Sequence, residues 1–191
     1  PSIAVGNKWM PSVVGVSDGF WMTAATANGT FFQTVVQAFD IDGNPRIEAH
    51  WVGSDSYAVF PNIDAKEDMY VVGWEGSDDV VQYVQGDIYG SFEEEVQTLE
   101  NQAGPKVIWD DNIDIVFTHQ LNPLQLLWNG QSLSGLSSTF FPNAARGIES
   151  VLFSYFRLQS GYKNDLYYGF LGEDGQIEVD SLLANEPPVA P

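Results

Sequence analysis

The turn at residues 40–44 carries the densest set of oxygen donors in this sequence. Asp40, Asp42 and Asn44 place two carboxylates and one amide around Gly43. Hard oxygen ligands close together in sequence suit calcium, so we predict a calcium site at Asp40, Asp42 and Asn44. The same pattern also suits a β-turn, because Asp and Asn tolerate positive φ and hydrogen-bond to their own backbone. An EF-hand loop is excluded, since its glycine and its terminal glutamate do not fall at the required places.

A second acidic cluster gives a weaker candidate for the same ion. Asp110 and Asp111 precede an expected strand, in which Asp114 takes an outward position. Paired carboxylates also serve glycoside hydrolysis. With 26 acidic residues in the chain, however, some pair meets the required separation by chance. The spacing of the acids therefore does not identify a catalytic pair.

Nucleophilic and zinc-dependent catalysis lack their usual patterns. The two histidines, His50 and His119, do not lie beside a Gly-x-Ser-x-Gly segment or at zinc-ligand spacing. We expect both to be satisfied within strands or turns. Sialidase propellers bind the carboxylate of their substrate with three arginines, and this chain also has three: Arg46, Arg146 and Arg157. The Asp-box repeat of those enzymes is absent, however. We therefore expect structural arginines.

The charge and the cysteine content of the chain limit the binding partners and metal sites that can be expected. The formal net charge is −19, with 26 acidic and 7 basic residues, so binding to nucleic acid or to an anionic membrane surface is not expected. There are no cysteines, which excludes disulfides and thiolate metal sites. No apolar run reaches the roughly 18 residues that a membrane-spanning helix needs. These features are typical of an extracellular or cell-surface protein.

Repeated Pro-led modules must position these residues. The strands that begin at Pro11, Pro61 and Pro105 are each followed by a polar turn and a second apolar strand. We divide the chain into modules at about 7–55, 56–101, 102–145 and 146–185, and five Gly-containing turns such as Asn129–Gly130 favour hairpins. Strand repeats of this period predict an all-β fold, a propeller-like array of about four blades. A β-sandwich or jelly roll is the alternative.

Two further features concern the ends and the core of this array. The fourth module shows too few strands, so residues 2–5 are a candidate to complete it and to close the ring. Trp21, Trp74 and Trp109 occur once per module, and we expect them in the core or between blades. We predict one domain at residues 1–185 and a Pro-rich linker to a neighbouring domain at 186–191.

The first module resembles a family of secreted bacterial and cyanobacterial β-propeller repeats. Pro11-Ser12-Val13 and Asp18-Gly19 match the opening of that repeat, and residues 37–44, which contain Phe39-Asp40, match its close. The resemblance extends over about residues 11–80. It implies a β-propeller within a multi-domain surface protein, and it carries no shared catalytic residues.

These observations give a ranked set of functions. The leading expectation is a non-enzymatic extracellular module that binds a carbohydrate or a peptide, with calcium as its candidate cofactor. One alternative is a hydrolase or lyase that acts on polysaccharide through an acidic pair. Another is a structural spacer without a ligand. The sequence does not place the ligand-binding residues.

Overall fold

The regular structure of this protein consists of β-strands. The computed structural model describes residues 7–28, 31–52, 57–89, 91, 95–109, 115–147, 150–159, 163–172 and 176–184. Within these ranges there is no helix, and hence none long and apolar enough to cross a membrane. The expected all-β class is confirmed.

The strands form four antiparallel sheets of four strands each, in which strands consecutive in sequence pair with one another. Sheet 1 contains β1 (Asn7–Val16), β2 (Gly19–Asn28), β3 (Phe31–Asp40) and β4 (His50–Val52), and sheet 2 contains β5 (Val59–Lys66), β6 (Met69–Glu75), β7 (Val80–Asp87) and β8 (Gln97–Glu100). Sheet 3 contains β9 (Gln102–Ile108), β10 (Ile115–Leu121), β11 (Leu124–Trp128) and β12 (Gln131–Ser137), and sheet 4 contains β13 (Thr139–Arg146), β14 (Val151–Gln159), β15 (Lys163–Leu171) and β16 (Ile177–Ala184). Each sheet is therefore built from one local stretch of chain.

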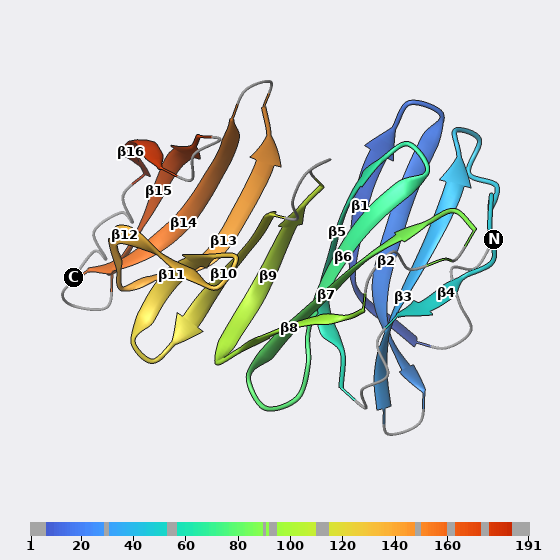
Figure 1. Ribbon diagram of the computed structural model, residues 1–191, viewed down its shortest axis with the longest axis horizontal. Coiled ribbons are helices and arrows are strands. Elements are labelled where there is room, and N and C mark those ends of the chain that lie inside the picture. Colours follow the sequence, from blue (N-terminus) through green and yellow to red (C-terminus); the bar gives the residue numbers. More distant parts are fainter. Residues whose placement is uncertain are drawn as a thin grey trace, which may run out of the picture.

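The sheets stand side by side, from sheet 1 in blue to sheet 4 in orange and red (Figure 1). Their first strands follow one another, with β1 against β5, β5 against β9 and β9 against β13. Apolar side chains fill the layers between them. Trp21 of sheet 1 meets Tyr70 of sheet 2 at a ring-centroid distance of 4.7 Å, and Phe117 of sheet 3 stacks on Phe153 of sheet 4 at 5.3 Å. The core therefore lies between the sheets, and Trp21, Trp74 and Trp109 are buried in it as expected.

Every first strand carries the same backbone irregularity. A residue with positive φ directly precedes a proline, and the strand register shifts at that point. The four pairs are Met10–Pro11, Phe60–Pro61, Gly104–Pro105 and Phe141–Pro142. Proline cannot donate to a sheet ladder, so within strands it is tolerated at bulges. The residue-proline pair is thus the sequence mark of a first strand.

This mark corrects the division of the chain. Thr139–Arg146 forms β13 of sheet 4, so the predicted boundary between 102–145 and 146–185 is wrong. Sheet 4 has four strands of its own and does not need a strand from residues 2–5, which lie outside the described residues together with the predicted linker at 186–191. No strand in the described part of the chain pairs sheet 4 with sheet 1, so the array is not a closed ring. Nor do four stacked sheets make a two-sheet sandwich.

Polar side chains tie the first strands together. The amide of Asn62 in β5 donates from Nδ2 to Ser12 Oγ in β1 at 3.1 Å, and its Oδ1 accepts the backbone N–H of Val107 in β9 at 2.9 Å. Asp64 accepts the backbone N–H of Trp109 at 2.9 Å. Asn62 therefore joins three sheets through one side chain.

We predict that Asn62→Ala lowers the free energy of unfolding by about 2–3 kcal/mol, because the buried N–H of Val107 loses its acceptor. Urea unfolding followed by tryptophan fluorescence measures the change. Asn143 occupies the matching position after Pro142, is exposed, and accepts a hydrogen bond from the backbone N–H of the neighbouring Ala144 and not from another sheet among the described residues. Asn143→Ala should therefore change stability by less than about 0.5 kcal/mol. Equal effects of the two substitutions would contradict the role given to Asn62.

Candidate functional site

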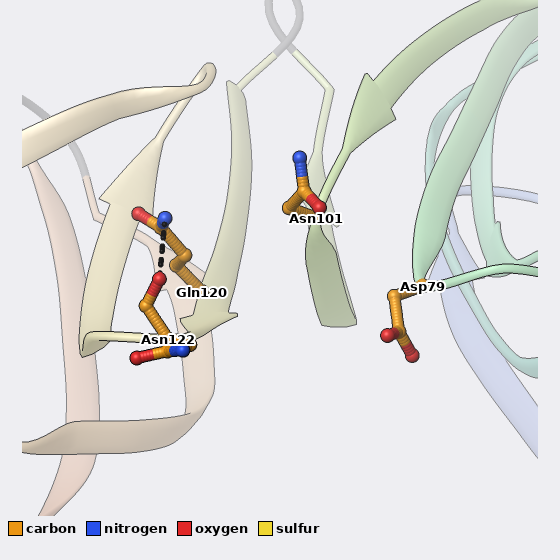
Figure 2. A pocket seen from close by; sticks show the side chains of 4 residues that line it. All are labelled: Asp79, Asn101, Gln120 and Asn122. Atoms are coloured by element: carbon orange, nitrogen blue, oxygen red, sulfur yellow. Dashed lines mark hydrogen bonds between the residues drawn. The ribbon is translucent and has the colours of Figure 1, made fainter.

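A polar hollow of about 370 Å³ opens between sheets 2 and 3, where β6 and β10 end. It is lined by Asp79 of the β6–β7 turn, Asn101 between β8 and β9, Gln120 of β10, and Asn122 of the β10–β11 turn. Figure 2 shows Asp79 across the hollow from Gln120 and Asn122. Gln120 donates to the backbone oxygen of Asn122 at 3.1 Å. One carboxylate and three amides supply the donors and acceptors that hydroxyl-rich ligands use.

Glu75, the last residue of β6, does not line this hollow, but it interacts with the charge of Asp79, which does. The side chain of Glu75 is partly buried, and its Oε1 accepts the backbone N–H of Gly104 at 2.6 Å. Burial raises the pKa of Glu75, and the negative charge of Asp79 raises it further, against the opposing effect of the Gly104 hydrogen bond. A carboxyl that keeps its proton to a higher pH than usual is suited to act as a general acid.

His119 lies on the other side of Gly104. Its ring meets the edge of Phe141 at a centroid distance of 5.5 Å, and it lies so close to Gly104 that an added Cβ there would fall 2.8 Å from the ring. Burial lowers the pKa of His119, so the imidazole is neutral near pH 7. Its Nδ1 has no hydrogen-bonding partner among the described residues, which corrects the expectation of a satisfied histidine.

Three residues around the hollow have left-handed backbone conformations. Asp78, Asp79 and Asn101 adopt positive φ values of 63°, 58° and 58°, which Asp and Asn tolerate in turns better than most residues do. These turns place Asp79 and Asn101 at the rim of one hollow.

The predicted calcium ligands lie far along the chain from this hollow, at the end of β3. The two carboxylate oxygens of Asp40 accept the backbone N–H of Asn44 at 2.7 Å and its side-chain amide at 3.0 Å. These hydrogen bonds lower the pKa of Asp40, the side chain of Asn44 contributing most. Within the described ranges there is no group of three or more His, Cys, Asp or Glu side chains that could hold a metal ion. Calcium at Asp40, Asp42 and Asn44 stays a prediction, and Asp110 and Asp111 lie outside the described residues.

The arginines are not brought together. Arg46 forms salt bridges with Asp18 at 3.0 Å and Asp68 at 2.8 Å, which join sheets 1 and 2. Arg157 lies over the ring of Tyr167 at 4.4 Å in sheet 4, and Arg146 ends β13. The expectation of structural arginines is confirmed for Arg46 and Arg157.

Sequence reasoning singled out neither Glu75 nor Asp79 as a site residue. Glu75 lies in the segment that follows the apolar strand Val71–Trp74, and an acid at the end of a buried strand was the available signal. The sequence does not show that this strand end meets Gly104, 29 positions further on.

Solved structures with a similar fold are glycoside hydrolases. The catalytic domain of the GH62 α-L-arabinofuranosidase from Coprinopsis cinerea matches 98% of this chain and 71% of its own, at 13% identity and a TM-score of 0.54. The exo-β-1,3-galactanase from Phanerochaete chrysosporium matches 92% of this chain at 10% identity and a TM-score of 0.54, and this chain spans only half of its length. The α-L-arabinofuranosidase from Podospora anserina, solved with cellotriose, matches 95% of this chain and 69% of its own at 11% identity and a TM-score of 0.51.

No protein-family model and no curated protein matches the sequence. At identities of 10–13%, the similar structures establish the fold alone. They nevertheless contradict the leading expectation of a non-enzymatic binding module, because the proteins that share this arrangement of sheets are hydrolases.

We predict that Gly104→Ala destabilises the protein by about 1–3 kcal/mol, since the φ of 63° is unfavourable for alanine and its Cβ would collide with His119. The midpoint of urea denaturation measures the loss. Gly15→Ala is the matched control, because a Cβ at Gly15 meets nothing within 4 Å. That control should leave stability unchanged or raise it slightly. A neutral Gly104→Ala would argue against the tight contact between β9 and β10.

Proposed function

We propose that this protein is a glycoside hydrolase that acts on a polysaccharide, with Glu75 as the general acid. The observation that carries the proposal is the partly buried Glu75, which accepts the backbone N–H of Gly104 and interacts with the charge of Asp79, a residue that lines a polar hollow between two sheets. Two carboxyl groups in different surroundings are what acid-base cleavage of a glycosidic bond requires. The likeness of the fold to glycoside hydrolases supports the same reading.

The chemistry divides between the two carboxyl groups. Glu75 gives its proton to the oxygen of the leaving sugar while the bond from that oxygen to the anomeric carbon breaks. Asp79, which is exposed, takes a proton from the water that attacks the anomeric carbon. The product alcohol and hemiacetal leave, and proton exchange with solvent restores both groups. Asn101, Gln120 and Asn122 hydrogen-bond to sugar hydroxyls in the hollow.

An exposed aromatic residue follows the strand position that pairs with Glu75. Val59 pairs with Glu75 across β5 and β6, and the next residue, Phe60, is 50% exposed. An exposed ring of this kind offers a face on which a sugar ring can stack. Arabinose- and galactose-containing polysaccharides are the first substrates to consider, given the names of the similar structures. Such substrates place the enzyme outside the cell, and its sheets correspond to blades of a propeller.

We expect Glu75→Gln to lower the rate on the best polysaccharide substrate about 100-fold or more, because general acid catalysis contributes 10²–10⁴-fold. Release of reducing sugar from arabinan, arabinoxylan and β-1,3-galactan measures the rate. An aryl glycoside with a strongly acidic leaving phenol needs little protonation, so the variant should keep most of its activity on that substrate. Glu100→Gln, at an exposed position of the same sheet, is the control and should stay active. An equal loss of activity on the polysaccharide and on the aryl glycoside would refute the assignment of Glu75 as the general acid.

A second prediction concerns pH. Removing the charge of Asp79 removes one cause of the raised pKa of Glu75, so in Asp79→Asn that pKa falls. The general acid must be protonated, and the alkaline limb of the pH profile should therefore move to lower pH in this variant. The measurement is kcat/KM as a function of pH on the polysaccharide, whose leaving sugar needs the proton of Glu75, at an enzyme concentration high enough to detect residual activity. An unmoved alkaline limb would show that Glu75 does not set it.

A further inference from the structure

Three of the residues that precede the prolines of the first strands are large, apolar and exposed. Met10, Phe60 and Phe141 have φ values of 52°, 50° and 49°, and they are 38%, 50% and 62% exposed. A bulky side chain at positive φ is unfavourable, and a side chain left in water gains little from the hydrophobic effect. At the fourth position, Gly104, the same backbone conformation has no steric cost. The fold alone therefore does not explain the two phenylalanines, and backbone strain of this kind gathers at functional sites.

The polar groups at this end of the array are gathered around Gly104. In each sheet, one residue of the second strand pairs with the residue just before the bulge. In the order of the sheets these residues are Ala25, Glu75, His119 and Phe156. Glu75 and His119 thus occupy equivalent positions in neighbouring sheets, and both lie against Gly104. The corresponding residues of sheets 1 and 4 are apolar.

Phe60 and Phe141 flank Gly104 in the order of the first strands. β9, which contains Gly104, packs against β5 on one side and β13 on the other. The ring of Phe141 meets His119 at a centroid distance of 5.5 Å and Phe140 at 5.2 Å, with interplanar angles of 75° and 69°. Edge-to-face contacts of this kind orient an aromatic ring. Phe141 is therefore held in place and still offers an exposed surface to a ligand.

The surroundings of these rings suit a neutral sugar. Gln120, the residue after His119, lines the polar hollow together with one carboxylate and two further amides. A sugar unit has an apolar face of C–H groups, on which an aromatic ring can stack, and an edge of hydroxyl groups, which amides and carboxylates bind. The net charge of −19 repels anionic ligands. Aromatic and amide side chains at one end of the array therefore favour an uncharged carbohydrate over an acidic peptide or a phosphate.

We propose that Phe60 and Phe141 stack on two different sugar units of one polysaccharide chain, on opposite sides of the glycosidic bond at Glu75. The backbone N–H of Gly104 holds the Glu75 carboxyl between the two strands that carry these rings. The proposal rests on the proposed function for its class of substrate. Binding of the polysaccharide is nevertheless measured separately from its hydrolysis.

Binding of arabinan, arabinoxylan and β-1,3-galactan to the full chain carrying Glu75→Gln tests the proposal, because this variant keeps an oxygen acceptor for Gly104 and leaves the polysaccharide largely uncleaved. Affinity electrophoresis in native gels containing each polysaccharide gives the dissociation constant. Adding Phe60→Ala or Phe141→Ala should weaken binding about 5- to 10-fold. Adding both should weaken it by about the product, 25- to 100-fold, because separate contacts add in free energy.

Two controls accompany these variants. Phe141→Tyr keeps the aromatic ring and should retain affinity to within about twofold. Tyr89→Ala removes an aromatic residue that is 85% exposed, beyond β7 and at the end of sheet 2 opposite to Phe60, and it should leave binding unchanged. Circular dichroism checks that each variant is folded.

The outcomes separate this proposal from the proposed function. Weaker binding in both alanine variants, with no hydrolysis by the native protein, would support the two stacking residues and refute the catalytic role. Hydrolysis by the native protein, with unchanged affinity in either alanine variant, would do the reverse. Absence of binding to all three polysaccharides would also overturn the stacking proposal. A double variant no weaker than the single ones would contradict two separate contacts.

Discussion

Each sheet in this molecule has two apolar faces, and an isolated four-stranded sheet cannot bury either of them. Stacking against a neighbour solves this, and the first strands of the sheets set the spacing of the stack. Asn62 supports the arrangement, because one amide bonds to the first strands of the sheets on both sides. The packing of Trp21 on Tyr70 and of Phe117 on Phe153 depends on that alignment.

The same first strands create the candidate site. The bulge before Pro105 takes Gly104 out of the ladder between β9 and β10, which leaves its backbone N–H free to donate outside sheet 3. Glu75, from the neighbouring sheet, accepts that N–H, and His119 closes over the glycine from the other side. The β-bulge that accommodates Pro105 therefore also positions Glu75, the carboxyl group whose pKa is raised.

Fold and candidate site were predictable to different degrees. The hairpin at Asn129–Gly130 and the buried Trp74 were indicated by the local pattern of the sequence. The boundary of the fourth sheet was misplaced, because β13 follows β12 so closely that spacing alone could not separate them. The composition of the acidic turn at residues 40–44 led to the prediction of a calcium site. In the structure the carboxylate of Asp40 accepts hydrogen bonds from Asn44 within the same turn.

By itself the sequence determined the all-β class, the repetition of a Pro-marked strand and the acidic, cysteine-free surface, since these follow from composition and from contacts between near neighbours. Tertiary structure alone decided which residues meet between sheets. Glu75 and Gly104 lie 29 positions apart, and only the stacking of sheet 2 on sheet 3 brings the carboxylate of Glu75 against the backbone N–H of Gly104. Tertiary structure also decided that only one of the two apolar faces of β14 is buried. Long-range packing of this kind depends on where whole sheets lie, which no local pattern records.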